Sequence, residues 1–412
     1  MERRAPLLGR REFLKSCVAA TVATGAAVAG NHAAGEPAPA PGQIARRPFG
    51  KTGVLLPVLG MGSSPMVARW SLGYGSRPGN IQERAALVRH AYDSGVRYFD
   101  TGRTYYDMER VIGQGLTGVH GDCFVATKVT VTDPALVRAS VEKSLAELGM
   151  DRVDVVQIHS SGAIEKLGFE GSMRIHAQLV KLREEGLFRY IGLTTHVAFE
   201  TVFKLIATGG FDQALLTVCY FNKGMDTLLS EQNRAFREQC LDKAHELGMA
   251  VVAMKVMGAS IFGRMSRVVV PDYDPGRRAK LPAAAMRWVL NDERVSLMAI
   301  GMGYPEEVAE NAATLSSDLT LTDADRELLA DYSAKAYQSP RIKAMGVDQP
   351  TRDPGETASS AIRQYDRNGD GKLSRGEFPP GRQQDFDTCD GNKDGFASLQ
   401  ELTDVLERRR EQ

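Results

Sequence analysis

Short apolar segments alternate with segments of helical periodicity along most of the chain, and this alternation constrains the fold more than any other feature. Buried parallel strands are short and apolar, and they are bordered by glycine or polar residues. Eight segments meet this description: 54–60, 96–100, 123–129, 153–159, 190–194, 215–220, 250–255 and 296–301. Helical periodicity fills the intervals at 81–94, 134–148, 173–185, 199–208, 230–247, 283–290 and 305–313. Eight strands with helices between them predict an α/β fold, a (β/α)8 TIM barrel.

A doubly wound open sheet is the alternative fold for the same alternation. A dinucleotide-binding sheet of that kind carries Gly-x-Gly-x-x-Gly directly after its first strand. This chain has only Gly60-Met61-Gly62-Ser63-Ser64 there, which is a loose substitute. The barrel is therefore favoured, preceded by two short strands around a Gly-containing turn within residues 49–56.

Three polar residues close successive predicted strands: Asp100, Lys128 and His159. Tyr105 follows Asp100 in the next loop. Because the carboxyl ends of barrel strands meet on one face, we expect these four side chains to converge there. An ammonium stabilises a phenolate and so makes a tyrosine a better acid. An acid, a lysine, a histidine and a tyrosine together suit reduction of a carbonyl, with the hydride coming from a cofactor.

Three motifs in residues 46–334 resemble the aldo/keto reductase superfamily. They are Asp100-Thr101-x-x-x-Tyr105, then Ser144-Leu145-x-x-Leu148-Gly149-x-Asp151-x-Val153-Asp154 leading into His159, and Gly186-Leu187-Phe188-Arg189-Tyr190-Ile191-Gly192-Leu193-Thr194. The resemblance implies a (β/α)8 barrel, a nicotinamide cofactor that is usually NADP, and a carbonyl or sugar-like substrate. It also implies that Asp100, Tyr105, Lys128 and His159 form the catalytic tetrad. Residues 261–275 indicate no substrate preference.

The resemblance places the cofactor after the later strands. The implied contacts are Thr194, Thr195, His196, Met254, Lys255, Gly301, Met302, Glu307, Glu310 and Asn311. Thr217 or Val218 occupies the place where the family often has a Gln. Glu307 falls where NADP-preferring members usually have Arg, and a carboxylate there would repel a 2′-phosphate. The sequence therefore leaves NADP and NAD open.

Two segments near the C-terminus resemble EF-hand calcium loops at every ligand position. Calcium prefers six to eight oxygens, supplied by positions 1, 3, 5, 7, 9 and 12 of such a loop, with Gly at position 6. The predicted ligands are Asp366, Asn368, Asp370, Lys372, Ser374 and Glu377 in the first loop, and Asp390, Asn392, Asp394, Phe396, Ser398 and Glu401 in the second. Leu373 and Ala397 occupy the positions that pair the two loops. We expect a compact, dockerin-like or calerythrin-like pair with two bound Ca²⁺ ions and a structural role or a role in docking to a protein partner.

The N-terminus is predicted to be an export signal. Arg10-Arg11-Glu12-Phe13-Leu14-Lys15 precedes a weakly apolar stretch, and Ala27-Val28-Ala29 is a candidate cleavage site, a pattern similar to a twin-arginine signal read by the Tat translocon. The predicted organisation is a signal peptide at 1–30, a linker at 31–45, the barrel at 46–335, a linker at 336–358 and an α-helical EF-hand pair at 359–410. This predicts a periplasmic or secreted protein with no membrane span after processing.

Composition excludes several other classes. Lysine and arginine total 51, as do aspartate and glutamate, so the net charge of zero argues against a surface built for nucleic acid. The five cysteines form no CxxC pair, which excludes an iron–sulfur relative. We therefore expect an exported, NAD(P)-dependent oxidoreductase with a calcium-binding module. The alternative is a non-catalytic barrel of the same type that acts as a binding protein and docks through its calcium-loaded EF-hand pair.

Overall fold

The computed structural model describes residues 43–67, 80–221, 231–344, 354–378 and 386–411. The predicted signal peptide and residues 31–42 of the predicted linker lie outside this range. Ile44, at the end of that linker, is buried in the barrel core. No helix within the described ranges is both long enough and apolar enough to cross a membrane.

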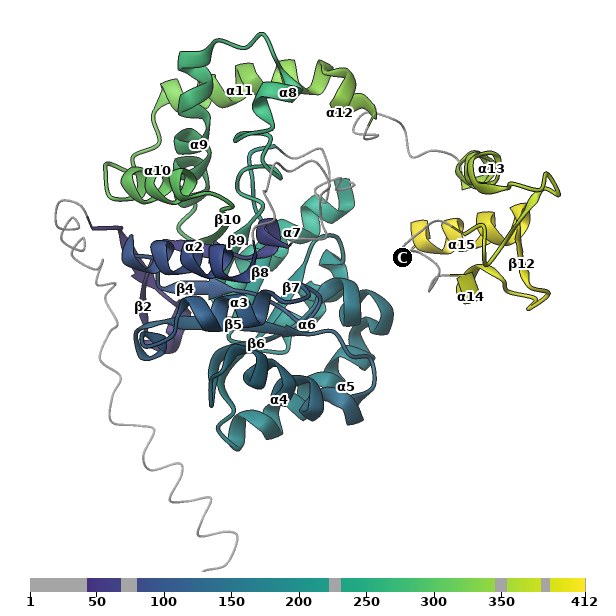
Figure 1. Cartoon of the computed structure of the whole chain (residues 1–412), viewed down its shortest axis with the longest axis horizontal. Coiled ribbons are helices and arrows are strands. Elements are labelled where there is room, and N and C mark those ends of the chain that lie inside the picture. The colour runs from purple at the N-terminus through teal and green to yellow at the C-terminus, as the bar shows by residue number, and fades with distance from the viewer. Residues whose placement is uncertain (1–42, 68–79, 222–230, 345–353, 379–385, 412) are drawn as a thin grey trace, which may run out of the picture. The chain divides into compact units, whose positions relative to one another are not determined.

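Eight parallel strands close into a barrel, which confirms the predicted fold class (Figure 1). Around the barrel the strands follow the order β10-β3-β4-β5-β6-β7-β8-β9. Their bounds are β3 Leu59–Gly62, β4 Tyr98–Asp100, β5 Phe124–Val129, β6 Val153–Ile158, β7 Phe188–Thr195, β8 Gln213–Thr217, β9 Ala250–Met254 and β10 Leu297–Gly301. Figure 1 shows helices surrounding these strands. The helices of the barrel region are α2 Ile81–Asp93, α3 Met108–Gly115, α4 Val137–Leu148, α5 Glu165–Glu184, α6 Phe199–Ala207, α7 Glu231–Glu246, α8 Ser266–Val269, α9 Pro275–Leu290 and α10 Pro305–Leu315.

Two helices begin earlier than their periodicity predicts. We expected 173–185, but α5 begins at Glu165, and Gly168 interrupts it with φ 59°. We expected 283–290, but α9 begins at Pro275 and contains Pro282. Proline and glycine normally indicate a helix end, because each disfavours the helical backbone. Packing against the barrel overrides that local signal at Pro282, which stays within α9, whereas at Gly168 the backbone does leave the helical conformation.

Alternation along the strands divides the core into two layers. Side chains such as Tyr98, Phe124 and Val155 point into the barrel and pack with one another. Their sequence neighbours, including Phe99 and Val156, point outward and pack beneath the helices. Because successive strand residues face opposite sides, this inside layer fixes which later residue of each strand reaches the carboxyl end of the barrel.

An N-terminal hairpin closes the amino end of the barrel. It pairs β1, Arg46–Pro48, with β2, Leu55–Pro57. Phe49, at its turn, is fully buried, with its ring centroid 4.7 Å from that of Phe124. The predicted strand 54–60 is therefore wrong, because residues 55–57 form a strand of this hairpin and the first barrel strand begins only at Leu59. Gly50 has φ 54°, and a Cβ there would lie 2.5 Å from the Gly248 carbonyl oxygen, so glycine is required at this contact.

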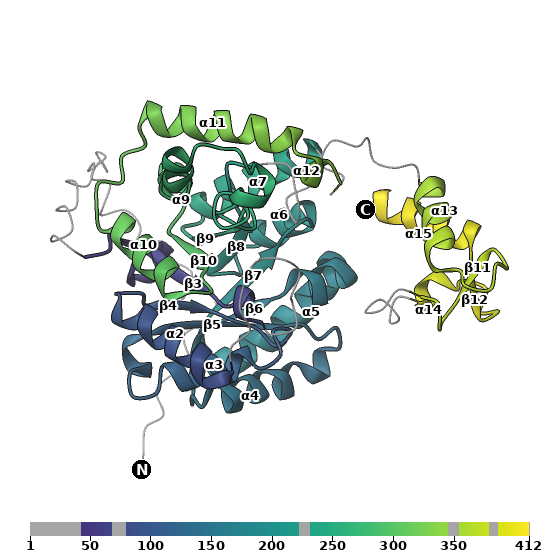
Figure 2. The same ribbon diagram turned by 45° about the horizontal axis from the view of Figure 1, so that its top comes forward.

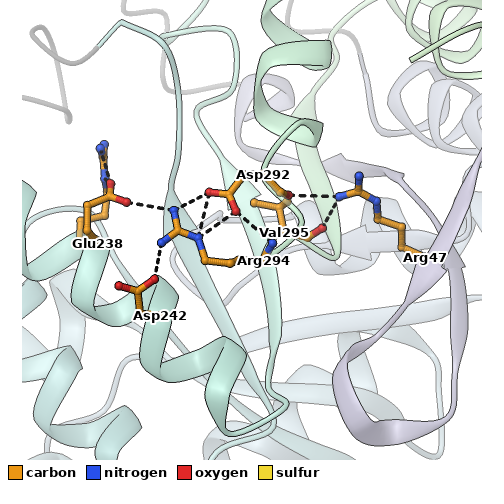
Figure 3. A network of polar contacts seen from close by, with 7 residues as sticks. Arg47, Glu238, Asp242, Asp292, Arg294 and Val295 are labelled. Atoms are coloured by element: carbon orange, nitrogen blue, oxygen red, sulfur yellow. Dashed lines mark hydrogen bonds and ion pairs between the residues drawn. The ribbon is translucent and has the colours of Figure 1, made fainter. Parts of the chain in front are cut away.

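An arginine of the hairpin ties it to the rest of the barrel (Figure 3). The Arg47 guanidinium donates to the carbonyl oxygens of Leu290, at 2.6 Å, and Val295, at 2.7 Å. Arg294, in the same loop, pairs with Asp292 at 2.6 Å and Asp242 at 2.6 Å. This polar network holds the C-terminal end of α9, where carbonyl groups lack helical partners, against both the hairpin and α7.

Two more helices extend the barrel beyond its predicted end at residue 335. They are α11, Asp323–Gln338, which lies across α9 (Figure 2), and α12, Pro340–Ala344. Tyr332 of α11 is buried and donates to the carbonyl oxygen of Ile261 at 3.0 Å. Ile342 of α12 is fully buried in the same cluster. The first part of the predicted linker 336–358 is thus helical and packed, because its scattered apolar residues meet an existing apolar surface.

The C-terminal region forms a small module with its own core. Its elements are α13 Pro354–Tyr365, β11 Lys372–Ser374, α14 Phe386–Cys389, β12 Phe396–Ser398 and α15 Leu399–Glu411. The short strands pair antiparallel, with Leu373 opposite Ala397 as the spacing predicts. Both side chains are buried. The position-6 glycines, Gly371 and Gly395, have φ of 77° and 90°, the left-handed conformation that a sharp loop turn requires.

Candidate active site

Strand alternation brings three of the predicted tetrad residues to the carboxyl end of the barrel. Asp100 follows the inward-facing Tyr98 by two residues, and Lys128 follows the inward-facing Ala126 by two. His159 directly follows β6 and continues the inward set begun by Val155. All three polar side chains are at least nine-tenths buried. Their positions follow from a two-residue period that the apolar layer below has already fixed.

Lys128 is held by two oxygens of strand β4 and the residue after it. Its Nζ atom lies 2.5 Å from Oδ1 of Asp100 and 2.6 Å from the carbonyl oxygen of Thr101. The other carboxylate oxygen of Asp100 accepts a hydrogen bond from Nε2 of Gln157 at 2.8 Å. A buried charge pair of this kind persists only where each charged group is also hydrogen-bonded.

Tyr105 lies beside the lysine and the histidine. Nζ of Lys128 is 4.9 Å from the centroid of the Tyr105 ring. The Tyr105 and His159 rings meet edge to face, with centroids 6.3 Å apart and planes at 86°. The structure therefore brings all four predicted tetrad residues together.

The environment sets the charge of two of these groups. Burial lowers the pKa of Lys128, but the charges of Asp100 and Tyr105 and hydrogen bonds to both raise it, so the pKa lies above its ordinary value. Burial and, to a lesser degree, the charges of Lys128 and His196 lower the pKa of His159 to about 3. At neutral pH the site thus holds an ammonium and a neutral imidazole, which can donate a hydrogen bond without adding a second positive charge.

Two ion pairs brace the loop that carries Tyr105, and the motifs in the sequence gave no sign of them. Arg84 of α2 binds both carboxylate oxygens of Asp107, at 2.8 and 2.6 Å, and this lowers the pKa of Asp107. Arg103 pairs with the buried Glu109. Glu109 also accepts a hydrogen bond from Thr127 at 2.6 Å. The loop is thereby fixed to α2 and to the outer face of β5 on either side of the tyrosine.

The residues predicted after β7 divide between two directions. Thr194 is buried and continues the inward set of Tyr190 and Gly192, so it faces the mouth of the barrel. Thr195 faces away, and its hydroxyl accepts from the backbone amides of Val197 and Ala198 at 3.2 and 2.8 Å. His196 lies close enough to His159 to lower its pKa.

On the next strand the structure decides between Thr217 and Val218. Val218 belongs to the outer core under the helices. Thr217 follows the inward-facing Leu215 by two residues and is fully buried. Its hydroxyl has no hydrogen-bond partner among the described residues.

Residues after β9 and β10 differ in their access to the mouth. Met254 ends β9 on the inward side, and Lys255 follows with φ 61°. Gly301 ends β10 and is exposed. The Met302 side chain is fully buried in the outer core, so only its backbone is available to a ligand. This residue falls on the outward side of the alternation.

Glu307 is already engaged by other groups. Its carboxylate accepts a hydrogen bond from the Gly303 amide at 2.8 Å, at the start of α10. It also pairs with Arg264, whose Nε lies 2.7 Å away. The Arg264 guanidinium lies 3.4 Å from the centroid of the Tyr304 ring. Of the other residues predicted here, Glu310 is exposed and Asn311 is buried.

The predicted calcium ligands lie in two loops of matching conformation. Glu377 accepts from the Ser374 hydroxyl at 2.7 Å and from backbone amides, which lowers its pKa to about 2. Glu401 and Ser398 repeat this contact at 2.7 Å. The carboxylates bind loop amides, and across the described residues no three Asp, Glu, His or Cys side chains gather closely enough to hold a metal ion.

Comparison with known families supports this picture. A model of the aldo/keto reductase family matches residues 69–269, and an EF-hand model matches residues 359–378. The L-galactose dehydrogenase of Arabidopsis thaliana is 26% identical over 326 residues, covering 71% of this chain and 94% of that protein. An aldo-keto reductase of Strobilurus tenacellus is 30% identical over 148 residues, covering 34% of this chain and 43% of that protein.

Solved structures share the fold. The aldo-keto reductase of Bacillus halodurans in its holo form has a TM-score of 0.55 and 18% identity, covering 70% of this chain and 96% of that one. The aldo-keto reductase of Klebsiella pneumoniae in complex with NADPH has a TM-score of 0.53 and 20% identity, covering 74% and 99%. At these identities the likeness establishes the barrel, and the chemistry must be argued from the side chains.

Proposed function

We propose that the barrel is an aldo/keto reductase that transfers hydride between a nicotinamide nucleotide and a carbonyl or alcohol substrate. The observation that carries this proposal is the arrangement of Lys128 between Asp100 and Tyr105, beside an imidazole that stays neutral. The family match over residues 69–269 supports it independently.

Each polar side chain has a definite task in carbonyl reduction. Tyr105 donates its phenolic proton to the oxygen that gains negative charge. The Lys128 ammonium stabilises the phenolate that remains, and Asp100 keeps that ammonium charged. The N–H of neutral His159 binds the same substrate oxygen and orients it. For alcohol oxidation the proton moves in the opposite direction along the same contacts.

The residues at the barrel mouth suit a nicotinamide. When bound, the cofactor supplies or accepts the hydride. The Thr194 and Thr217 side chains fall on the inward side of β7 and β8, and the Thr217 hydroxyl has no partner among the described residues. A buried hydroxyl without a partner is costly, and a carboxamide could satisfy it. Met254 offers an apolar surface for the ring.

The choice between NADP and NAD depends on the surroundings of Glu307. A bare carboxylate would repel a 2′-phosphate, but Arg264 compensates its charge in this chain. We therefore propose that both nucleotides are accepted, and that the guanidinium limits discrimination against NADP.

Binding and turnover of purified protein test the proposal. Fluorescence of NADH and NADPH should change on binding, and oxidation of the bound nucleotide should follow addition of an aldehyde, ketone or sugar substrate from a panel. The absence of binding at millimolar nucleotide would refute the enzyme and favour the binding-protein alternative. Binding without turnover of any panel member would refute the assigned chemistry.

We also propose that the C-terminal module binds calcium at both loops and that the protein is exported through the Tat system to the periplasm or beyond. The EF-hand match, the left-handed Gly371 and Gly395 and the strand pairing between the loops support the first proposal. The paired Arg10 and Arg11 support the second. Export of a folded chain would let it carry its nucleotide along. We propose further that the barrel takes a small-molecule substrate and that the C-terminal module binds a protein partner.

A further inference from the structure

We infer that Gln157 is a positioning residue for the Asp100–Lys128 pair, and that its amide fixes the carboxylate orientation on which proton donation by Tyr105 depends. The inference rests on the proposed function, because it assigns a role within the same site. Gln157 belongs to none of the motifs that predict the tetrad.

The Gln157 side chain joins two strands across a third. Its backbone lies beside Lys128 in the register between β5 and β6. Its Nε2 atom reaches Oδ2 of Asp100 on β4 at 2.8 Å, while Lys128 occupies Oδ1 at 2.5 Å. A carboxylate only accepts hydrogen bonds, so the NH₂ group of the glutamine must face it. Each oxygen of Asp100 therefore has its own donor, and rotation of the carboxylate would weaken both bonds.

The neighbouring strand leaves space for this side chain. Gly192 on β7 lies opposite Gln157 in the register. A Cβ at Gly192 would lie 2.9 Å from Cγ of Gln157 and 3.0 Å from Cγ1 of Val155. At those distances the glutamine would have to move, so the glycine preserves the path of its side chain toward Asp100.

A second glutamine provides a matched comparison within the same barrel. Gln213 lies opposite Gly192 on the other side, in β8, and is fully buried like Gln157. Its Oε1 accepts a hydrogen bond from the Tyr98 hydroxyl at 2.9 Å, in the layer below the site. Removal of either amide deletes a buried hydrogen bond, but only Gln157 contacts the tetrad carboxylate in the described structure.

The experiment compares Gln157→Met with Gln213→Met, using the nucleotide and substrate that the wild type prefers. We expect Gln157→Met to lower kcat by at least about tenfold and to change the nucleotide Kd by less than about twofold. The reason is that the substitution disturbs the orientation of the Asp100 carboxylate and removes no contact to the nucleotide. Gln213→Met should lower Tm to a similar extent and leave kcat unchanged. Gln157→His, which places a ring N–H at a similar reach, should recover part of kcat.

A double-mutant cycle with Asp100→Asn completes the test. If Gln157 acts through Asp100, Gln157→Met should reduce kcat much less in the Asp100→Asn background than in the wild type. Losses that multiply independently, or equal kcat losses in both glutamine variants, would overturn the inference. If the wild type binds nucleotide but turns nothing over, the proposed function fails. The unfolding free energies of the same four proteins then decide separately: additivity of Gln157→Met and Asp100→Asn would show that the amide does not hold the carboxylate.

Discussion

The ammonium of Lys128 lies 2.5 Å from Oδ1 of Asp100, and the pair is almost fully excluded from solvent. Removing one partner leaves the other charge buried and alone, which costs about 3–5 kcal/mol in comparable cases. We expect Lys128→Met to lower the free energy of unfolding by an amount in this range, and Lys128→Met with Asp100→Leu to lower it less. Denaturant titration measures both. A double variant less stable than Lys128→Met would contradict the assignment of the lost stability to an uncompensated charge.

Tyr105→Phe should lower kcat for carbonyl reduction by at least about 100-fold, because the variant has no proton to donate. Nucleotide binding should persist, since the ring is retained. The matched control is Tyr106→Phe, which changes the adjacent and exposed tyrosine and should leave kcat within about twofold of the wild type. Steady-state kinetics and a fluorescence titration provide the comparison. Equal effects of the two substitutions would rule out the proposed proton donor.

The low pKa of His159 predicts a specific loss of stability in acid. In the unfolded chain this imidazole takes up a proton near its ordinary pKa of 6.5, but in the folded chain it does so only near pH 3. The unfolded state therefore binds more protons between these values, and the free energy of unfolding falls as the pH drops through that window. At pH 4.5 this effect lowers the free energy of unfolding by about 2–3 kcal/mol relative to its value at neutral pH.

His159→Gln removes this contribution. We expect the stability difference between wild type and variant, measured by denaturant titration, to shrink or reverse between pH 7.5 and pH 4.5. Parallel pH dependences for the two proteins would mean that His159 titrates normally.

Glu307→Gln should shift the nucleotide preference toward NADPH. The substitution removes the charge that engages Arg264 and leaves that guanidinium available for an anion. The kcat/KM ratio of NADPH to NADH should rise by about fivefold, equivalent to about 1 kcal/mol. Glu306→Gln is the control, because Glu306 is more exposed and lies 4.0 Å from the same arginine. An unchanged ratio in Glu307→Gln would refute the assignment.

Calcium should stabilise the C-terminal module. We expect added Ca²⁺ to raise the Tm of its unfolding transition and EDTA to lower it, because metal binds the folded loops. Glu377→Gln combined with Glu401→Gln should abolish the response, since both position-12 carboxylates are lost. Asp404→Asn, which alters a carboxylate of α15 outside the loops, should retain it. A wild type that melts identically in Ca²⁺ and EDTA would exclude calcium from these loops.

Sequence patterns predicted the features that depend on local spacing. The barrel, the positions of Asp100 and Lys128 at the carboxyl ends of β4 and β5, and the pairing of Leu373 with Ala397 all follow from periods or motifs within a few residues. Predictions failed where a segment's neighbours changed its conformation. Residues 55–57 of the predicted first strand form part of the N-terminal hairpin instead. Pro282 lies within α9, where packing against the barrel stabilises the helix.

The sequence by itself determined which polar residues lie at the carboxyl ends of the strands, because strand side chains alternate with a period of two residues. It also determined which loops have calcium-ligand spacing, because the ligands occupy fixed positions along the loop. Only the tertiary structure decided which side chains these site residues contact. Gln157 meets Asp100 and Arg264 meets Glu307 across 57 and 43 residues of sequence. Such contacts depend on strand register and barrel closure, which arise from the packing of all eight strands together and leave no local trace in the chain.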